Sequence, residues 1–452
     1  MEKRDVTVEE LLAKAEQPSK EAMRLHKFYR GKIGVNLKCR IRDFNDFAIW
    51  YTPGVAAVCK AIHQDKDKVY DYTNKWNFVA VISDGSRVLG LGDIGPEAGL
   101  PVMEGKGLLY KYLGGVDAFP LCLNEKDPDR FIDIVKALQP TFGGINLEDI
   151  SHPKCFKILD TLRTECEIPV WHDDQQGTAC VTVAGLINAL KIVGKKIEDI
   201  QVTVVGAGAA GIAISRLLMT AGVTPGKILS VDSKGILHRN RSDRDILQKQ
   251  FKEKWSLCLV QNEKQIKGDI PDAVKGADVL ISASKQGPGT IRKDWIKTMA
   301  KDAIVFAEAN PVPEIWPWEA KEAGARIVAT GRSDFPNQVN NSLGFPGIFR
   351  GALDVRAKTI TDEMCIEAAR ELAKVAEDKG IHEEYIVPNM DEWEVFPREA
   401  VAVGTKAIEQ GVARISISAE ERFKMAEATI KESRAQVQLL MKEKFIIDPD
   451  KK

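Results

Sequence analysis

Two groups of residues in this sequence have types and spacings that suit chemistry: a run of glycines and four paired acids. The run 206–211 (GAGAAG) directly follows the apolar segment 201–205 and opens a helical pattern that reaches residue 221. A glycine turn between a strand and a helix is the fingerprint of a dinucleotide-binding fold, because the backbone there can approach a pyrophosphate closely. The candidate cofactor-binding residues of this turn are Gly206, Gly208, Ala209, Ala210 and Gly211.

An acid stands at the expected distance beyond the turn. Asp232 ends the apolar segment 227–232, 21 residues after Gly211. In this position a carboxylate accepts hydrogen bonds from the ribose hydroxyls of NAD and repels the 2′-phosphate of NADP. The sequence therefore favours NAD. NADP stays possible, because the basic residues Lys234, Arg239 and Arg241 are close enough to bind a phosphate. A glycine turn without any ligand is the purely structural alternative.

The four acids are Glu148-Asp149 and Asp173-Asp174, and each pair follows a strand-like stretch, 144–147 or 168–172. The carboxyl ends of neighbouring strands in an open α/β sheet meet at one edge, so we expect the acids to converge there. Without a cation between them they would repel one another. Oxygen ligands without cysteine favour a hard divalent ion, Mg²⁺ or Mn²⁺. Two solvated acidic turns are the alternative interpretation.

The elements that must position these residues alternate between strand and helix. This alternation predicts an α/β fold with parallel strands: a substrate-binding α/β domain and a Rossmann-type, doubly wound NAD(P)-binding domain, with helical N- and C-terminal segments. The last segment, 418–446, is a surface helix or an oligomer contact, and we favour the contact. Strands are predicted at 78–83, 118–123, 142–146, 168–172, 201–205, 227–232, 278–282, 303–307 and 326–329, and helices at 7–29, 55–63, 105–113, 128–138, 153–163, 177–193 and 212–221.

Composition excludes several classes of protein. The 452 residues carry 64 basic and 65 acidic side chains, and this balance argues against a nucleic-acid binder, which needs a basic excess. The eight cysteines form no CxxC pair, which is typical of reduced thiols rather than of a zinc or disulfide framework. The longest uncharged stretches, 175–190 and 200–215, are too short and too polar to span a membrane. The acidic first 30 residues match no targeting peptide, so we expect a cytoplasmic protein.

Further short segments occur in a characteristic order along the chain. Together with the glycine turn, they resemble the malic enzyme family of the compact bacterial and archaeal kind. The matching segments are YTPGVA at 51–56, DGSRVLGLGDIG at 84–95, GK at 105–106, NLED at 146–149, HDDQQGTA at 172–179, ANP at 309–311 and NNSLGFPG at 340–347. Several segments in the family's order are far more specific than any one of them.

The resemblance implies oxidative decarboxylation of L-malate to pyruvate and CO₂, with reduction of NAD or NADP and a requirement for Mg²⁺ or Mn²⁺. It implies that Glu148, Asp149 and Asp174 are the metal ligands. It also implies that Asp173 belongs to the catalytic group, as a carboxylate that orients the site. The resemblance thus strengthens the metal-site interpretation of the four acids.

The same resemblance implies roles for other residues. Lys106 matches the family's catalytic lysine and would act as a base only with a depressed pKa. Tyr51 matches the catalytic tyrosine, a general acid for the carbon that loses CO₂. On their own, Lys106 would be interpreted as a solvated lysine, with Lys111 a weaker candidate for the role, and Tyr51 as packing in its turn. The implied substrate-binding residues are Arg87, Asn310 and Asn341, and Asn310 is also a candidate cofactor contact.

We predict a substrate domain in residues 1–172 that is completed by 341–452, and an NAD(P)-binding domain in 173–340. The resemblance suggests a homodimer or higher homo-oligomer that acts on L-malate and pyruvate, without nucleic acid or membrane as partners. The alternatives are a malolactic enzyme, which converts malate to lactate, an amino-acid dehydrogenase, and a non-catalytic NAD-sensing protein. The GGGK run expected for the amino-acid dehydrogenase is absent from the sequence.

Overall fold

Two mainly parallel sheets form the centre of the fold in a computed structural model that describes residues 8–450, with side chains from residue 18 onward. The first sheet has the order β2-β1-β3-β4, and all its neighbours are parallel. Its strands are β1 (Phe78–Ser83), β2 (Asp117–Cys122), β3 (Gly144–Leu147) and β4 (Val170–His172). All residues of β3 and β4 are buried, as expected for parallel strands that helices cover on both faces.

Three helices connect these strands: α5 (Pro96–Gly114), α6 (Pro128–Leu138) and α7 (Lys154–Glu165). The predicted strands and helices of this region are present. Helix α5, however, begins well before the predicted residue 105, because prolines at its first and sixth positions conceal the helical pattern. Proline is tolerated at the first helical position, where its missing N–H would have no partner within the helix.

The second sheet has the order β10-β9-β8-β5-β6-β7. Its first five strands are parallel, and only the short β7 pairs antiparallel, with β6. The strand order reverses between β5 and β8, which is the switch point at which doubly wound sheets bind their ligands. The predicted doubly wound α/β fold is confirmed. The strands are β5 (Val202–Val205), β6 (Ile228–Asp232), β7 (Gly235–Ile236), β8 (Val279–Ser282), β9 (Ala303–Ala307) and β10 (Ala325–Thr330).

Helix α8 (Thr178–Val193) leads from the first sheet into the second, and α9 (Ala209–Ala221) follows the glycine turn. A π-helical turn, Asp173–Gly177, precedes α8 and packs against α9. In the described part of the chain, Asp173–Val193 is the one helical stretch with the length and apolar composition to cross a membrane, but 72% of its apolar 18-residue window is buried inside the fold. The shorter helices of this sheet are α10 (Arg244–Gln250), α11 (Lys252–Val260), α12 (Ile270–Val274), α13 (Lys293–Ile296) and α14 (Pro317–Glu322).

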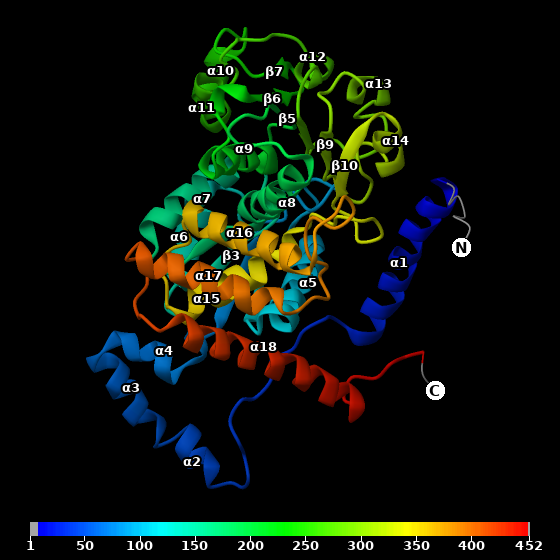
Figure 1. Ribbon diagram of the computed structural model, residues 1–452. Coiled ribbons are helices and arrows are strands. Elements are labelled where there is room, and N and C mark those ends of the chain that lie inside the picture. The colour runs from blue at the N-terminus through cyan, green and yellow to red at the C-terminus, as the bar shows by residue number, and fades with distance from the viewer. Residues whose placement is uncertain (1–7, 451–452) are drawn as a thin grey trace.

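After residue 340 the chain packs against both sheets' helices (Figure 1). Helices α15 (Phe345–Asp354) and α18 (Ala419–Lys442) contact α5, and α16 (Asp362–Lys379) contacts α8 and α9. Helix α17 (Val395–Glu409) lies on α15 and α16. The predicted segment 418–446 is thus largely one helix, packed along one side on α5 and α17, and its part in an oligomer stays a prediction.

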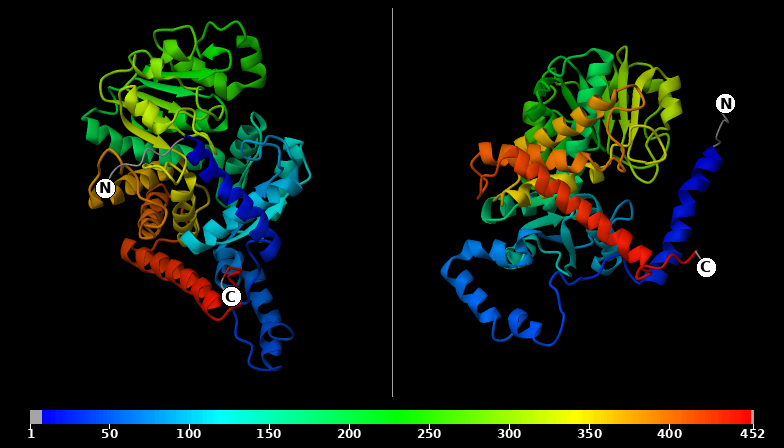
Figure 2. Two further views of the ribbon diagram at one scale, coloured as in Figure 1. Left: turned by 90° about the vertical axis from the view of Figure 1, so that its right-hand side faces the viewer. Right: turned by 60° about the horizontal axis from the view of Figure 1, so that its bottom comes forward.

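The N-terminal helices stand apart from this body (Figures 1 and 2). They are α1 (Val8–Tyr29), α2 (Asp46–Trp50) and α3 (Val55–Gln64), and α4 (Val69–Tyr72) returns the chain to the first sheet. None of the ten residues of α3 is buried. We call α2, α3 and the turn between them the arm. It extends below the body in Figure 1.

Candidate active site

The four acids of the sequence analysis converge where β3 and β4 end. Leu147 and His172 are direct partners across these parallel strands, so the acids that follow them leave the sheet side by side. Glu148, Asp149 and Asp174 each offer one carboxylate oxygen, and these oxygens all lie within 4.8 Å of one another. Glu148 and Asp149 are buried, and Asp174 is partly buried. The alternative of two solvated acidic turns is therefore excluded by the geometry.

The backbone holds this cluster in place. Asp149 has a left-handed conformation with φ +54°. Its N–H donates to Asp174 Oδ2 at 2.9 Å, and its own Oδ1 accepts from the Leu89 N–H at 3.1 Å. Asp149 Oδ2 is buried and has no hydrogen-bond partner among the described residues. A buried, unpartnered oxygen among three carboxylates fits a hard divalent cation such as Mg²⁺ or Mn²⁺.

Two carboxyl groups of this cluster have raised pKa values. Burial raises the pKa of Asp149 to about 7, and the charge of Asp174 adds to this effect. Burial likewise raises the pKa of Glu148 well above its ordinary value, and the neighbouring acids oppose the lowering effect of Lys106. Carboxylates are kept neutral when like charges share a low-dielectric site. A bound cation would reverse that preference, because it needs the ionised ligands.

Lys106 lies inside this acidic group. It projects from α5, is 8% exposed, and forms an ion pair with Asp173 and another with Glu148, the latter at 3.3 Å. Its ammonium also sits 4.6 Å from the centre of the Phe345 ring, where a cation is attracted to the aromatic face. The interpretation of Lys106 as a solvated surface lysine is therefore wrong. Lys111 instead pairs with Asp117 at 2.8 Å, outside the acidic group.

The pKa of Lys106 differs from the expectation. Burial lowers this pKa, but the charges of Asp173 and Glu148 outweigh burial and hold it above the ordinary value. The condition for Lys106 to act as a base, a depressed pKa, is thus not met by the side chains alone. Sequence reasoning counted burial and omitted the two acids, which lie far away in the chain and close in the fold.

Three buried residues that the sequence analysis did not assign support the acids. The indole N–H of Trp171 donates to Asp173 Oδ1 at 3.0 Å. The side-chain amide of Asn146 donates to Glu148 Oε2 at 3.0 Å, and the Tyr110 hydroxyl donates to Asn146 Oδ1 at 2.8 Å. Trp171 and Asn146 both belong to the strands that precede the acids. Their closeness to the acids in the sequence was the one feature from which their supporting role could have been predicted.

The implied substrate residues are distributed around the cluster. Arg87 is exposed, its backbone N–H donates to the Asp149 carbonyl at 3.0 Å, and its charge lowers the pKa of Asp149 against the raising effect of burial. A Cβ on Gly177 would lie 2.1 Å from Asp173 Oδ1 and 3.1 Å from the Asn341 Cβ, which places Asn341 beside Asp173. Both residues therefore lie next to the acids, and their roles stay predictions.

The glycine turn has the form that the sequence predicts. Gly206 has φ +103°, and a Cβ on Gly211 would lie 1.7 Å from the Gly206 carbonyl oxygen, so the helix can pack this closely only without a side chain. A Cβ on Gly208 would meet no atom within 4 Å, which leaves room for a ligand. In the part of the chain that the structure describes, no side chain caps α9, whose first turn starts at Ala209 and Ala210. Its free N–H groups suit a phosphate.

Asp232 lies at the carboxyl end of β6 but is already engaged by cations. It accepts hydrogen bonds from Arg241 at 2.9 Å and from Lys254 at 3.1 Å. Burial would raise the pKa of Asp232, but the bond from Arg241 and the nearby positive charges lower it on balance. The acid is thus ionised, as ribose recognition requires, and two cations lie beside it.

The sequence matches two protein-family models. They are the malic enzyme N-terminal domain, over residues 31–163, and the malic enzyme NAD binding domain, over residues 175–408. The chain belongs to the malic enzyme family. The family predicted from the motifs is therefore confirmed, as is a nicotinamide dinucleotide-binding domain built on the second sheet. The predicted domain boundaries at 172/173 and 340/341 stay predictions.

Individual malic enzymes are similar over most of their length. The bifunctional malic/malolactic enzyme of Bacillus subtilis is 51% identical over 403 residues, which cover 89% of this chain and 96% of the relative. The NAD-dependent malic enzyme of Geobacillus stearothermophilus is 51% identical over 384 residues, covering 85% and 78%. The crystal structure of Entamoeba histolytica malic enzyme superposes with a TM-score of 0.94 at 51% identity and covers 98% of this chain and 93% of its own.

Two predicted residues of this malic enzyme lie away from the acids. Tyr51 follows α2 on the arm and is 73% exposed. The arm extends away from the two sheets (Figure 2). The fold does not bring it to Lys106 within one chain. Asn310 follows β9 instead, where its side-chain amide lies against Gly331 after β10, at the carboxyl edge of the second sheet.

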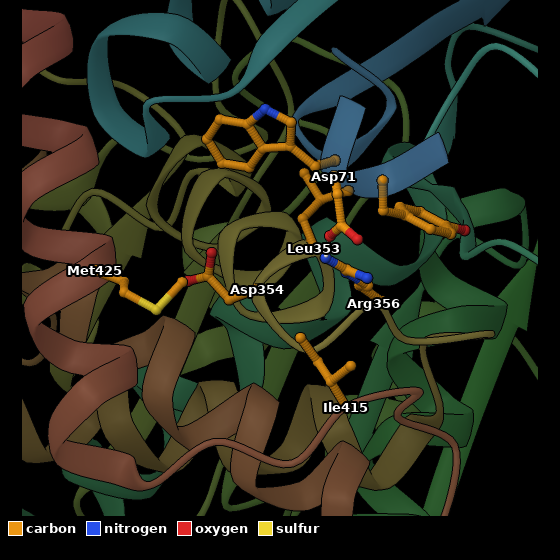
Figure 3. Close-up of a pocket in the computed structure, with 8 residues that line it drawn as sticks. Asp71, Leu353, Asp354, Arg356, Ile415 and Met425 are labelled. Carbon is orange, nitrogen blue, oxygen red and sulfur yellow. Dashed lines mark hydrogen bonds and ion pairs between the residues drawn. The ribbon is translucent and has the colours of Figure 1, made fainter. Parts of the chain in front are cut away.

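A separate cavity of about 270 Å³ lies at the opposite end of α15 from Phe345. Figure 3 shows Asp354, Arg356 and Met425 around this cavity. Arg356 and Asp71, which also lines it, form an ion pair. None of its lining residues is among the predicted site residues. Since a ten-residue helix is about 15 Å long, this cavity is not part of the acidic site.

Proposed function

We propose that this malic enzyme oxidatively decarboxylates L-malate to pyruvate and CO₂ and reduces NAD. The observation that carries the proposal is the convergence of Lys106 with Glu148, Asp149 and Asp174 at one sheet edge. The turn that bears Asp174 packs against α9, which follows the glycine turn. A hydroxy acid held at the carboxylates would therefore lie close to a dinucleotide bound at that turn.

Bound at these carboxylates, Mg²⁺ or Mn²⁺ would favour loss of the malate C2 hydroxyl proton and stabilise negative charge on the C2 oxygen. With this cation bound, the acidic charges that raise the pKa of Lys106 would be offset, so Lys106 Nζ would then be able to exchange that proton, with Asp173 orienting it. Arg87 supplies a positive charge for a substrate carboxylate, and Asn341 a polar group beside Asp173. The buried aromatic rings of Phe345 and Trp171 help to exclude water from this side.

A steady-state assay tests the proposal. L-malate is supplied with NAD or NADP, with and without Mn²⁺, while NADH absorbance, pyruvate and lactate are measured. Metal-dependent NADH and pyruvate formation in equal amounts is the expected result. NAD binding without any turnover would instead identify a nucleotide-sensing protein.

Malolactic activity is a second candidate, because the Bacillus subtilis relative carries both activities in its name. In that reaction malate gives lactate without net NADH. Lactate as the sole product in the same assay would establish this alternative.

The cofactor preference is proposed to depend on Asp232. Changing Asp232 to Ser removes the ribose acceptor and frees Arg241 and Lys254 for a 2′-phosphate. We expect the ratio of kcat/KM for NAD over NADP to fall by roughly 30-fold, since a charge-assisted hydrogen bond is lost and a phosphate site is gained. The measurement is kcat/KM for each cofactor at saturating malate. An unchanged ratio would contradict the role of Asp232.

We propose that the protein is a cytoplasmic homodimer in which the arm docks on the partner. The arm exposes large apolar side chains, which is typical of a protein interface. Its exposed large apolar residues are Phe47, Ile49, Trp50, Tyr51 and Val55, and Phe44 lies two residues before it. Because Tyr51 stands on the arm, the dimer would deliver it to the acidic site of the other chain.

Hybrid dimers test this arrangement. Lys106→Ala and Tyr51→Phe chains are each expected to be inactive alone, and mixing them after dissociation should restore activity. If Lys106 and Tyr51 come from different chains, a hybrid contains one site with both residues intact. If both act from the same chain, no hybrid site is intact and mixing restores nothing. Activity against mixing ratio is the measurement, with the oligomeric state checked by sedimentation.

A further inference from the structure

Two buried glutamates at the carboxyl edge of the second sheet have no part in the chemistry above. Glu308 follows β9, is 8% exposed, and its N–H donates to the Ser282 carbonyl at the end of β8. Glu314 is fully buried in the same loop region, which also contains Asn310. The adenosine half of a dinucleotide lies toward β6, where Asp232 stands, so the nicotinamide half lies over β8 and β9. Both acids therefore belong to the nicotinamide side.

The two glutamates differ in their hydrogen bonds. Glu314 accepts from the Ser282 hydroxyl at 2.8 Å and from the backbone N–H groups of Ser284 and Ala309 at 2.9 and 3.1 Å. These donors suit an ionised carboxylate. Glu308 Oε1 instead contacts only the Thr182 hydroxyl, at 2.8 Å, and its Oε2 is buried without a partner among the described residues.

Glu308 has a single, shared hydrogen-bond donor. The Thr182 hydroxyl donates to Glu308 Oε1 at 2.8 Å, and it lies equally close, 2.8 Å, to the Thr178 carbonyl, so its one proton is shared between two acceptors. An ionised carboxylate that is buried, with one shared donor and one oxygen without a partner among the described residues, is poorly compensated. The geometry therefore favours the neutral carboxylic acid.

The surrounding charges agree with this geometry. Burial raises the pKa of Glu308 to about 8, the Thr182 contact lowers it, and the Glu314 charge raises it. Glu314 acts on Glu308 from its own loop. Burial raises the pKa of Glu314 as well, against the lowering effect of its hydrogen-bond donors. Helix α8 presents the Thr182 hydroxyl and β8 the Ser282 hydroxyl. Arg332 contacts the nearby Pro311 carbonyl, but its guanidinium is paired with Asp334.

We propose that Glu308 sets the relative affinity of the site for the two redox forms of the cofactor: a negative charge on this buried side chain, near the nicotinamide, favours binding of NAD⁺ over NADH. The ring of NAD⁺ is cationic and that of NADH is neutral, so a buried carboxylate discriminates between them electrostatically. The proposal rests on the proposed function, because it needs the dinucleotide at the glycine turn. Glu308 would thus discriminate between NAD⁺ and NADH, a role that the four acids do not have.

Direct nucleotide binding tests the proposal without turnover. The dissociation constants of NADH and NAD⁺ are measured by fluorescence and calorimetry, without malate and with Mg²⁺ present to keep the acidic cluster ionised, at about pH 6.5 and about pH 9.5. In the wild type we expect the ratio of the NADH constant to the NAD⁺ constant to rise roughly fivefold or more with pH, as a nearby charge predicts. In Glu308→Gln, which stays neutral, the ratio should be independent of pH. Glu322→Gln, which removes an exposed carboxylate from α14, should behave as the wild type.

The outcomes separate the two proposals. A wild-type ratio that does not change with pH, or one that changes equally in Glu308→Gln, would overturn the role of Glu308 while leaving the function intact. Failure of both nucleotides to bind at any pH would overturn the function as well.

Infrared spectroscopy of the unchanged chain gives a second measurement that does not require a variant to fold. Glu399 is also fully buried and has its pKa raised well above the ordinary value, so it should contribute a constant carboxylic acid band. With Mn²⁺ present to ionise the acidic cluster, one further component of that band should be present at neutral pH and disappear on titration through about pH 8. Its absence from Glu308→Gln or Glu308→Leu would identify the residue. A wild-type protein whose band does not differ from that of Glu308→Gln at neutral pH would contradict the proposal.

Discussion

Replacing Lys106 by Ala should lower kcat by roughly 10³-fold or more, about 4 kcal/mol of activation free energy, while NAD binding stays unchanged. The reason is geometric: among the described residues, Lys106 is the one ammonium in contact with both Asp173 and Glu148. Its loss removes the group that exchanges the substrate proton and leaves two buried acids without their counter-charge. Steady-state kinetics and a NADH binding titration measure the two effects separately.

Lys111 offers a matched control for this experiment. It lies on the same helix, is partly exposed, and pairs with Asp117 away from the acids. Lys111→Ala should therefore keep kcat within about threefold of the wild type, as surface changes usually do. Near wild-type turnover in Lys106→Ala, or an equal loss in Lys111→Ala, would contradict the role of Lys106.

The second large effect is expected from Asp174. Asp174→Asn removes one of three clustered carboxylates and should lower turnover at ordinary Mn²⁺ concentrations by roughly 10³-fold or more. It should also abolish the rise in melting temperature that Mn²⁺ produces in the wild type, because a ligand that binds only the folded state stabilises it. Treatment of the wild type with a chelator should remove activity, and Mn²⁺ should restore it.

Calorimetric titration with Mn²⁺ separates metal affinity from catalysis. Asp245→Asn removes an equally short acid from an exposed place on α10 and should leave both Mn²⁺ affinity and activity unchanged. If Asp174→Asn binds Mn²⁺ as tightly as the wild type, the cluster is not the metal site.

The sequence predicted helices and strands best where residues typical of their ends, such as turn or capping residues, were present. Strand β1 matches its predicted range because six largely apolar residues end at an Asp-Gly-Ser turn, and α6 matches because Asp127 caps it before Pro128. The short helices α10 to α14 could not be predicted, because four to nine residues carry too little periodicity. Prolines likewise concealed the start of α5.

The acidic site was predictable for a different reason. The rule that parallel strands end at one edge placed all four acids together, without any knowledge of packing. Tyr110 escaped prediction because its contact with Asn146 joins residues 36 positions apart. The position of Tyr51 escaped it too, because whether an arm folds back or extends depends on contacts that no local pattern encodes.

One feature of the fold bears on how the enzyme tolerates heat. Asp173 and Asp174 do not sit on a surface loop that can fray, since they open a helix whose interior packs against α9 and α16. Segments that loosen first on warming are those with few buried contacts. The acidic centre should therefore keep its geometry until the whole molecule melts. The arm, which carries Tyr51, should leave its partner and become sensitive to proteases first, so activity should be lost on warming before the acidic centre unfolds.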